Sequence, residues 1–205
     1  MSSANKAGKP TAVRILGIDP GLNITGYGVI DATGGVSTLC EAGVIRLPPS
    51  KARDLAERLG LLFDEVRLLV REFSPRLLCL EEVYSHALYP RTAILMGHAR
   101  GVICVAARQA GIPVLSYSAK RIKQSVTGNG NASKIQVQRA VRQVFSLERT
   151  PHPPDVADAL AAALCYVNGL KDGMNRDQTS ALRRGHQSGR ISIAQLNQIL
   201  LRRNA

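Results

Sequence analysis

Apolar and polar positions follow two different periods along the chain, and these periods predict strands and helices. Three apolar runs near the N-terminus are separated by turn residues at Gly21 and at 33–35, a pattern typical of an antiparallel meander. Two later runs, RLLCLEEVY and IPVLSY, each have the length of one buried strand. The three N-terminal strands are expected at residues 13–19, 25–31 and 36–46.

Steps of three and four between apolar residues predict the helices. A long helix should end before Pro75, because a residue preceding proline avoids the helical conformation. Its apolar stripe consists of Leu55, Leu59, Leu62, Phe63, Val66, Leu69, Val70 and Phe73. A second helix is expected over about 90–110, with Gly111 as its stop signal.

The second half of the chain adds two more helices. The segment 125–134, SVTGNGNASK, is polar and rich in glycine, so it is expected to be a loop. Ser133 and Gln136 have the spacing of a capping box, which predicts a helix through Phe145. The last helix, DVADALAAALCYV, follows Pro153 and Pro154.

Three strands followed by alternating helices and strands predict an α/β fold, with a mixed five-stranded sheet flanked by helices. A length of 205 residues suits one such domain with additional tails. We expect a flexible polar leader at 1–12, the folded domain at 13–169 and a basic, flexible tail at 170–205.

Charge and cysteine content narrow the classes of function. The chain carries 27 Lys and Arg against 15 Asp and Glu, a formal net charge of +12. This excess favours nucleic acid as a partner, although a basic protein without such a partner is the alternative. The four cysteines form no CxxC pair and are expected to be reduced core residues, without a zinc site. With no signal segment or membrane-spanning run, we expect a cytoplasmic protein with no membrane partner.

Four acidic residues stand where an unpaired charge is costly. Asp19 and Glu81 end apolar strand runs, and Asp155 and Asp158 share one face at the start of an apolar helix. Carboxyl ends of parallel strands gather at one sheet edge. Two charges about 4 Å apart repel by roughly 4 kcal/mol at an effective dielectric constant of about 20. If these carboxylates converge, they require a cation, and oxygen ligands suit Mg²⁺ or Mn²⁺.

Simpler interpretations remain open for these acidic residues on spacing alone. Asp19 precedes Pro-Gly and can be a turn residue, and Asp155 can be a first-turn residue favoured by the helix dipole. Asp158 is harder to explain in this way, because its neighbours are apolar. Strand alternation directs one of Glu81 and Glu82 inward, without indicating which.

Several segments resemble, in the same order, those of the RuvC family of Holliday-junction resolvases. They are LGIDPGLNITGYGVI, CLEEVY, GHARGV, KQSVTGNGNASKIQV and DVADALAAAL, and together they extend from about Ile15 to Val167. The resemblance implies a ribonuclease-H-like fold and a homodimer that cuts four-way junction DNA symmetrically in recombination and repair. It also implies a branch-migration helicase complex as a partner, and it places the dimer interface on the helix at 90–110.

By position, the resemblance assigns roles to seven residues. It implies that Asp19, Glu81, Asp155 and Asp158 are catalytic and hold two Mg²⁺ ions per site, with Mn²⁺ as a substitute. Some members have histidine at the position of Asp155. Tyr84 would stack on bases near the crossover, and Lys123 and Lys134 would contact DNA. Packing of Tyr84 and simple exposure of the lysines are the alternatives. His86 and His98 are interpreted as surface or packing residues.

Two other classes of function compete with this hypothesis. A non-catalytic junction-binding protein would keep the fold without cutting, yet all four acidic positions are present. An actin-like ATPase or sugar kinase also has an apolar first strand ending in Asp-x-Gly. Such proteins need two related domains, and this chain has no second copy of the motif.

Overall fold

A mixed five-stranded sheet forms the centre of the computed structural model, which describes residues 12–49, 53–83 and 90–171. The strand order is β3-β2-β1-β4-β5. The first three strands are antiparallel neighbours, whereas β4 is parallel to β1 and β5 is parallel to β4. The predicted mixed sheet is therefore confirmed. Its strands are β1 (Val13–Asp19), β2 (Ile24–Thr33), β3 (Val36–Arg46), β4 (Leu77–Glu81) and β5 (Val114–Tyr117).

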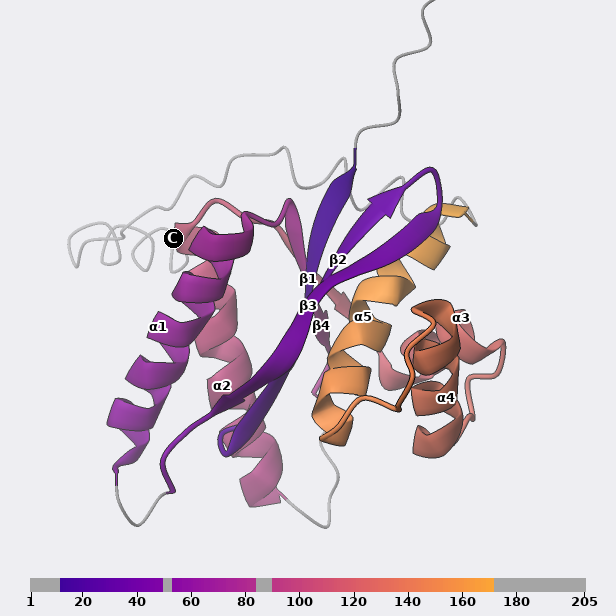
Figure 1. The fold of residues 1–205 in the computed structure, drawn as a ribbon. Helices are drawn as coiled ribbons and strands as arrows, with labels where there is room; N and C mark the ends of the chain where they lie inside the picture. Colours follow the sequence, from indigo (N-terminus) through magenta and orange to yellow (C-terminus); the bar gives the residue numbers. More distant parts are fainter. Residues whose placement is uncertain (1–11, 50–52, 84–89, 172–205) are drawn as a thin grey trace, which may run out of the picture.

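Five helices cover the two faces of this sheet (Figure 1). Two of them, α1 (Leu55–Phe73) and α2 (Pro90–Gln109), pack on one face. The opposite face is covered by α3 (Ala119–Thr127), α4 (Lys134–Val144) and α5 (Pro154–Lys171). Each face has its own apolar core, so both sides of the central strands are buried.

Local signals explain where the helices begin and end. Asp54 and Glu57 form a capping box at the start of α1, and the helix ends at Phe73 as predicted. The predicted Ser133–Gln136 capping box starts α4 and is also confirmed. The helix α5 starts one residue earlier than predicted, since Pro154 occupies its first turn, where proline is favoured. It extends to Lys171, two residues beyond the expected domain boundary at 169.

The prediction of a loop over 125–134 is wrong for its first three residues. They belong to α3, which Ser118 caps through its side chain and which ends at Gly128 in the left-handed conformation. Ile122 is the buried residue of this short helix. The helix therefore lacks the apolar stripe on which the sequence-based prediction depended.

The cysteines only partly follow the prediction of core residues. Cys79 and Cys165 are buried and Cys104 is half-buried, all three as free thiols. Cys40 is exposed, because it lies on β3 at the edge of the sheet, so the prediction is wrong at this position. Among the described helices, none combines the length and the apolar character needed to cross a membrane.

Candidate functional site

Two of the predicted acidic residues end neighbouring parallel strands. The register pairs Ile18 of β1 with Leu80 of β4, and the next residues in each strand are Asp19 and Glu81. In β4, Cys79 belongs to the core under α5, whereas Leu80 belongs to the core under α1 and α2. Strand alternation therefore places Glu81 on the α5 face. Glu82 is exposed, which settles the inward residue of the pair.

The other two acidic residues reach the same place because α5 lies unusually close to the sheet. A Cβ atom at Gly17 would overlap the carbonyl oxygen of Ala159, and one at Gly26 would overlap that of Asp155. Gly26 is also the cross-strand partner of Asp19. These glycines therefore allow the first turns of α5 to lie directly over the ends of β1 and β2.

All four acidic side chains line one cleft of about 1080 Å³, together with Lys123 and Lys134. These six residues come from five elements: β1, β4, α3, α4 and α5. The turn after Asp19 and the N-terminal parts of α1 and α2 form the remaining wall of the cleft. The structure therefore brings together six of the seven predicted site residues. Tyr84 and His86 lie outside the described residues.

Burial and like charge dominate the electrostatics of this cleft. Burial raises the pKa of Asp19 to about 8, and repulsion from Asp158, Glu81 and Asp155 contributes to the same shift. The pKa of Glu81 is also raised, first by burial and then by Asp158, while Lys134 and Lys123 oppose the shift. Burial and the neighbouring negative charges therefore disfavour the ionised forms of Asp19 and Glu81.

Lys134 begins α4 and provides the nearest positive charge. Its Nζ lies 3.3 Å from Asp158 Oδ2, with 73 % of the lysine side chain exposed and only 18 % of the aspartate side chain. Asp158 is also the main cause of the raised pKa of Lys134. One carboxylate of the four is thus ion-paired, and the ammonium group that pairs with it remains accessible to another anion.

The donor set fits a hard divalent cation. Four carboxylates supply oxygen ligands, and none of the described residues that line the cleft is a histidine or a cysteine. A cation would also offset the repulsion that raises the pKa of Asp19. In the described ranges, no three His, Cys, Asp or Glu side chains form a preformed metal-binding cluster. The ligand types in the cleft therefore fit a metal ion, but the carboxylates would have to move closer together to bind it.

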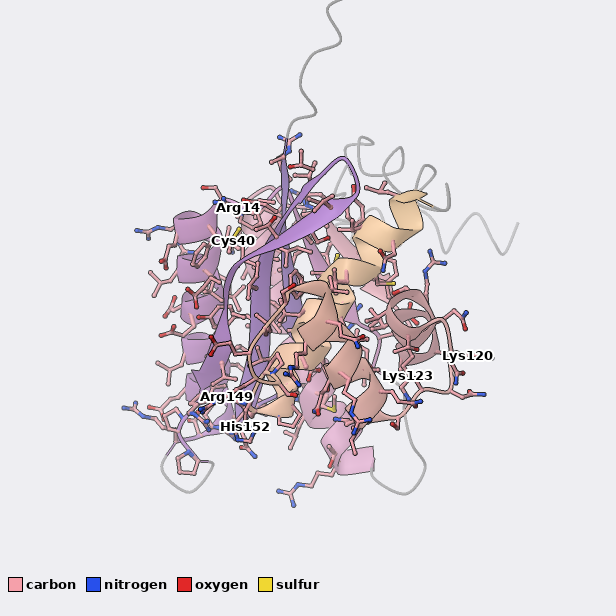
Figure 2. The ribbon with its side chains drawn as sticks, turned by 45° about the vertical axis from the view of Figure 1, so that its right-hand side comes forward. Arg14, Cys40, Lys120, Lys123, Arg149 and His152 are labelled. Atoms are coloured by element: carbon pink, nitrogen blue, oxygen red, sulfur yellow. The ribbon has the colours of Figure 1, made fainter. Side chains whose placement is uncertain are left out.

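The basic residues of α3 differ in whether they line the cleft. Lys123 lines the cleft from α3, while Lys120 on the same helix does not line it (Figure 2). Arg121 instead stacks over the ring of Tyr117, with 5.6 Å between its Cζ atom and the ring centroid. His98 is exposed, in agreement with its interpretation as a surface residue.

Sequence reasoning missed three arginines that line the cleft: Arg53, Arg58 and Arg91. Arg58 is the one for which the sequence held a signal. It lies three residues after Leu55 and four before Leu62, within the spacing of the apolar stripe of α1. A charged residue at such a position is buried or has a special role.

Comparisons with known proteins show the family to which the chain belongs. Residues 15–166 match the family described as crossover junction endodeoxyribonuclease RuvC. The relative of that name from Rhodopirellula baltica is 50 % identical over 151 residues, 74 % of this chain and 84 % of the relative. The one from Halorhodospira halophila is 44 % identical over 170 residues, 83 % of this chain and 99 % of the relative.

A solved structure, T. thermophilus RuvC in complex with Holliday junction substrate, superposes with a TM-score of 0.73 at 31 % identity. The alignment covers 79 % of this chain and 97 % of that chain. The ribonuclease-H-like architecture implied by the resemblance is thereby confirmed. The chain belongs to the RuvC family of crossover junction endodeoxyribonucleases.

Proposed function

We propose that this chain resolves four-way (Holliday) DNA junctions by symmetric, metal-dependent hydrolysis of phosphodiester bonds. One observation carries the proposal: four acidic and two basic side chains from five elements line one cleft in a member of the RuvC family. T. thermophilus RuvC was solved in complex with a Holliday junction substrate, and we assign the same substrate class here. The net charge of +12 suits a polyanion of this kind.

Asp19, Glu81, Asp155 and Asp158 would hold the divalent cations, which we propose are two Mg²⁺ ions, with Mn²⁺ as a substitute. When bound, such ions lower the pKa of a water nucleophile and offset the negative charge on the leaving oxygen. The carboxylates would fix the positions of these ions at the sheet edge, and the bound ions would in turn orient the reacting phosphate. Glycines at positions 17 and 26 support this role, because they permit the approach of α5.

Lys134 and Lys123 contribute positive charge where the scissile phosphate would lie. Lys134 begins α4, so its ammonium group and the amide groups of the first helical turn can act on one anion. We propose that it exchanges its contact with Asp158 for a phosphate oxygen, stabilising the charge that develops during the reaction. Lys123 lines the same cleft from α3 and opposes the rise in the pKa of Glu81.

Symmetric cutting requires two sites, and we propose that the chain forms a homodimer through α2. Ile94 and Val105 have 60 % and 51 % of their surfaces exposed, and their spacing of eleven residues places them on the same face of this helix. Gly97 and Gly101 leave open space beside the helix, which permits close approach of another helix. Stacking of Tyr84 on an unpaired base and association with a branch-migration helicase remain predictions.

We propose that the central part of the sequence forms the nuclease domain. Residues 13–169, extended to the observed end of α5 at Lys171, form the nuclease domain. Apart from residue 12 and the last two residues of α5, the predicted leader at 1–12 and the predicted tail at 170–205 lie outside the described residues. We also propose that the protein acts in the cytoplasm.

The decisive experiment is incubation of purified full-length protein with a labelled four-way junction and with linear duplex of the same sequence. Each substrate is tested with Mg²⁺ and with EDTA. We expect paired, symmetric nicks in the junction with Mg²⁺, no cutting with EDTA and little cutting of the duplex. Junction binding without cleavage under all conditions would contradict the proposal and favour a non-catalytic junction-binding protein.

A further inference from the structure

The turn that follows Asp19, residues 20–23, is held by an unusual set of polar contacts. Apart from tyrosines and cysteines, the described part of the chain has two buried polar residues, Thr25 and Arg58. Both bind this turn, although one lies on β2 and the other on α1. The buried polar chemistry of the fold is therefore concentrated immediately beyond the strand-end carboxylate Asp19.

Arg58 reaches the turn from α1. Its Nη2 donates to the carbonyl oxygen of Leu22 at 2.6 Å and to Oδ1 of Asn23 at 2.8 Å. Only 4 % of the residue is exposed, and its Nε is buried without a hydrogen-bond partner. None of the ion pairs among residues in the described ranges includes Arg58. Its charge is therefore buried against neutral acceptors.

Thr25 and the backbone complete the attachment of the turn. The Thr25 hydroxyl donates to the carbonyl oxygen of Gly21 at 2.6 Å and accepts from the Gly21 amide at 3.2 Å. The Leu47 amide donates to the carbonyl oxygen of Asn23 at 3.1 Å. Three consecutive residues of the turn, Gly21, Leu22 and Asn23, are thus fixed from three different parts of the sequence.

This arrangement is a poor way to stabilise the fold. Burying a guanidinium costs free energy that neutral acceptors only partly return, and its Nε remains unsatisfied. Even a buried ion pair can often be replaced by apolar residues of similar volume without loss of stability, so a buried charge is weak evidence for a stabilising role. A role in the site accounts better for Arg58, because the turn that it holds lines the cleft beside Asp19.

We infer that Arg58 is a positioning residue for Asp19, acting through the turn at 20–23. By fixing Leu22 and Asn23, it holds the chain where β1 leaves the sheet and keeps the Asp19 carboxylate directed at the other three. The same contacts fix one wall of the cleft along which a DNA strand would pass. This inference rests on the proposed function of Asp19.

The test compares Arg58→Met, Arg58→Lys and Asn23→Ala with Arg67→Met as the matched control. Arg67 lies on the same helix, is exposed and contacts Phe63 rather than the turn. Asn23 is also exposed, so its variant should fold even if Arg58→Met does not. The measurements are single-turnover junction cleavage at saturating protein, junction affinity in EDTA, melting temperature and hydrogen exchange of the Gly21 amide.

We expect Arg58→Met to reduce the single-turnover rate at least tenfold while junction affinity changes less than threefold and the melting temperature falls by only about 2–4 °C. The Gly21 amide should exchange faster in the same variant. Arg58→Lys should recover part of the rate, Asn23→Ala should lose several-fold, and Arg67→Met should match the unaltered protein.

Three results would overturn the inference: an unchanged cleavage rate in both Arg58→Met and Asn23→Ala, a loss of rate explained by lost stability, or a loss confined to junction affinity. The last result would make Arg58 a DNA-binding residue instead. The variant Asp19→Asn distinguishes a failure of the catalytic role of Asp19 from a failure of the positioning role of Arg58. If Asp19→Asn still cuts, the proposed catalytic role of Asp19 fails and the positioning role fails with it; if it is inactive while the Arg58 and Asn23 variants cut normally, only the positioning role fails.

Discussion

Strand β1 carries a charged residue near each end, and the two ends solve the problem of buried charge differently. At one end, which we term the ion-pair end, Arg14 donates from Nε and Nη2 to the two carboxylate oxygens of Asp31, both at 2.9 Å. At the other, the carboxylate end, Asp19 lies among Glu81, Asp155 and Asp158. Figure 2 shows Arg14 beside Cys40, away from Lys123.

The pKa shifts of the two aspartates have opposite signs. The hydrogen bonds from Arg14 hold the pKa of Asp31 below its usual value, whereas burial and like charges raise that of Asp19 to about 8. At the ion-pair end, Arg14 balances the charge of Asp31 without any group from outside the protein. At the carboxylate end, the negative charges repel one another until a cation from outside binds, as expected for a binding or catalytic site. The same residue type on neighbouring strands therefore forms an ion pair at one end and, in our proposal, part of a metal site at the other.

Exchanging each aspartate for asparagine should separate these roles most strongly. Asp19→Asn should reduce junction cleavage by about a thousandfold or more, corresponding to about 4 kcal/mol of transition-state stabilisation. Asp31→Asn should cut at nearly the normal rate but melt at a lower temperature, because Arg14 loses a charged partner. Cleavage and melting curves measured on both variants test the contrast. Equal loss of cleavage in the two variants would contradict it.

The close approach of α5 should also be essential at the carboxylate end. Gly26→Ala forces its Cβ against the carbonyl oxygen of Asp155, so we expect at least tenfold slower cleavage and a loss of roughly 1–3 kcal/mol in unfolding free energy. Gly60→Ala is the matched control. It lies in α1 with open space around the added atom, and it should stabilise by about 0.5–1 kcal/mol without slowing cleavage. Denaturant unfolding and single-turnover cleavage measure both effects. Normal cleavage by Gly26→Ala would show that α5 need not lie so close.

Removing the nearest ammonium group should have an intermediate effect. Lys134→Met should slow cleavage at saturating DNA by about ten- to a hundredfold, because charge developing on the phosphate loses a stabilising contact. Lys120 is on α3 but does not line the cleft, so Lys120→Met should leave the saturated rate unchanged and only weaken the salt dependence of binding. The comparison requires cleavage rates and junction affinities at several salt concentrations. Identical rate losses in the two variants would argue against a specific role for Lys134.

The smallest effect concerns the pH dependence of stability in EDTA. Because the folded protein raises the pKa of Asp19, it binds more protons than the unfolded chain between about pH 4 and 8. Its unfolding free energy should therefore fall as the pH rises through this range. Asp31 acts oppositely: its lowered pKa adds stability above about pH 4, which is lost in acid. Melting temperatures from pH 5 to 8 should fall less for Asp19→Asn than for the unaltered protein or Asp31→Asn. An equal fall in all three would remove Asp19 as the cause.

Sequence periodicity predicted most of the fold, for a physical reason visible in particular elements. The stripe from Leu55 to Phe73 and the Ser133–Gln136 capping box are local signals, and α1 and α4 follow them closely. The helix α3 was missed because it buries a single apolar residue, Ile122. The exposure of Cys40 depends on strand order in the sheet, which its local sequence does not specify.

The residues of the candidate site could be predicted from the sequence, but the packing that brings them together could not. Strand-end positions indicated Asp19 and Glu81, yet the inward direction of Glu81 follows only from the faces covered by α2 and α5. The roles of Gly17 and Gly26 depend on how closely α5 approaches the sheet, a long-range property. Arg58 was missed because its acceptors lie about 35 residues away in the sequence.

The most direct test is anomalous diffraction from crystals of the full-length protein grown with Mn²⁺. The account predicts manganese density between the carboxylates of Asp19, Glu81, Asp155 and Asp158, absent from crystals of Asp19→Asn and retained in those of Asp31→Asn. Manganese bound only elsewhere, or no ordered manganese at concentrations that support cleavage, would contradict the central claim that these four side chains gather around a divalent cation.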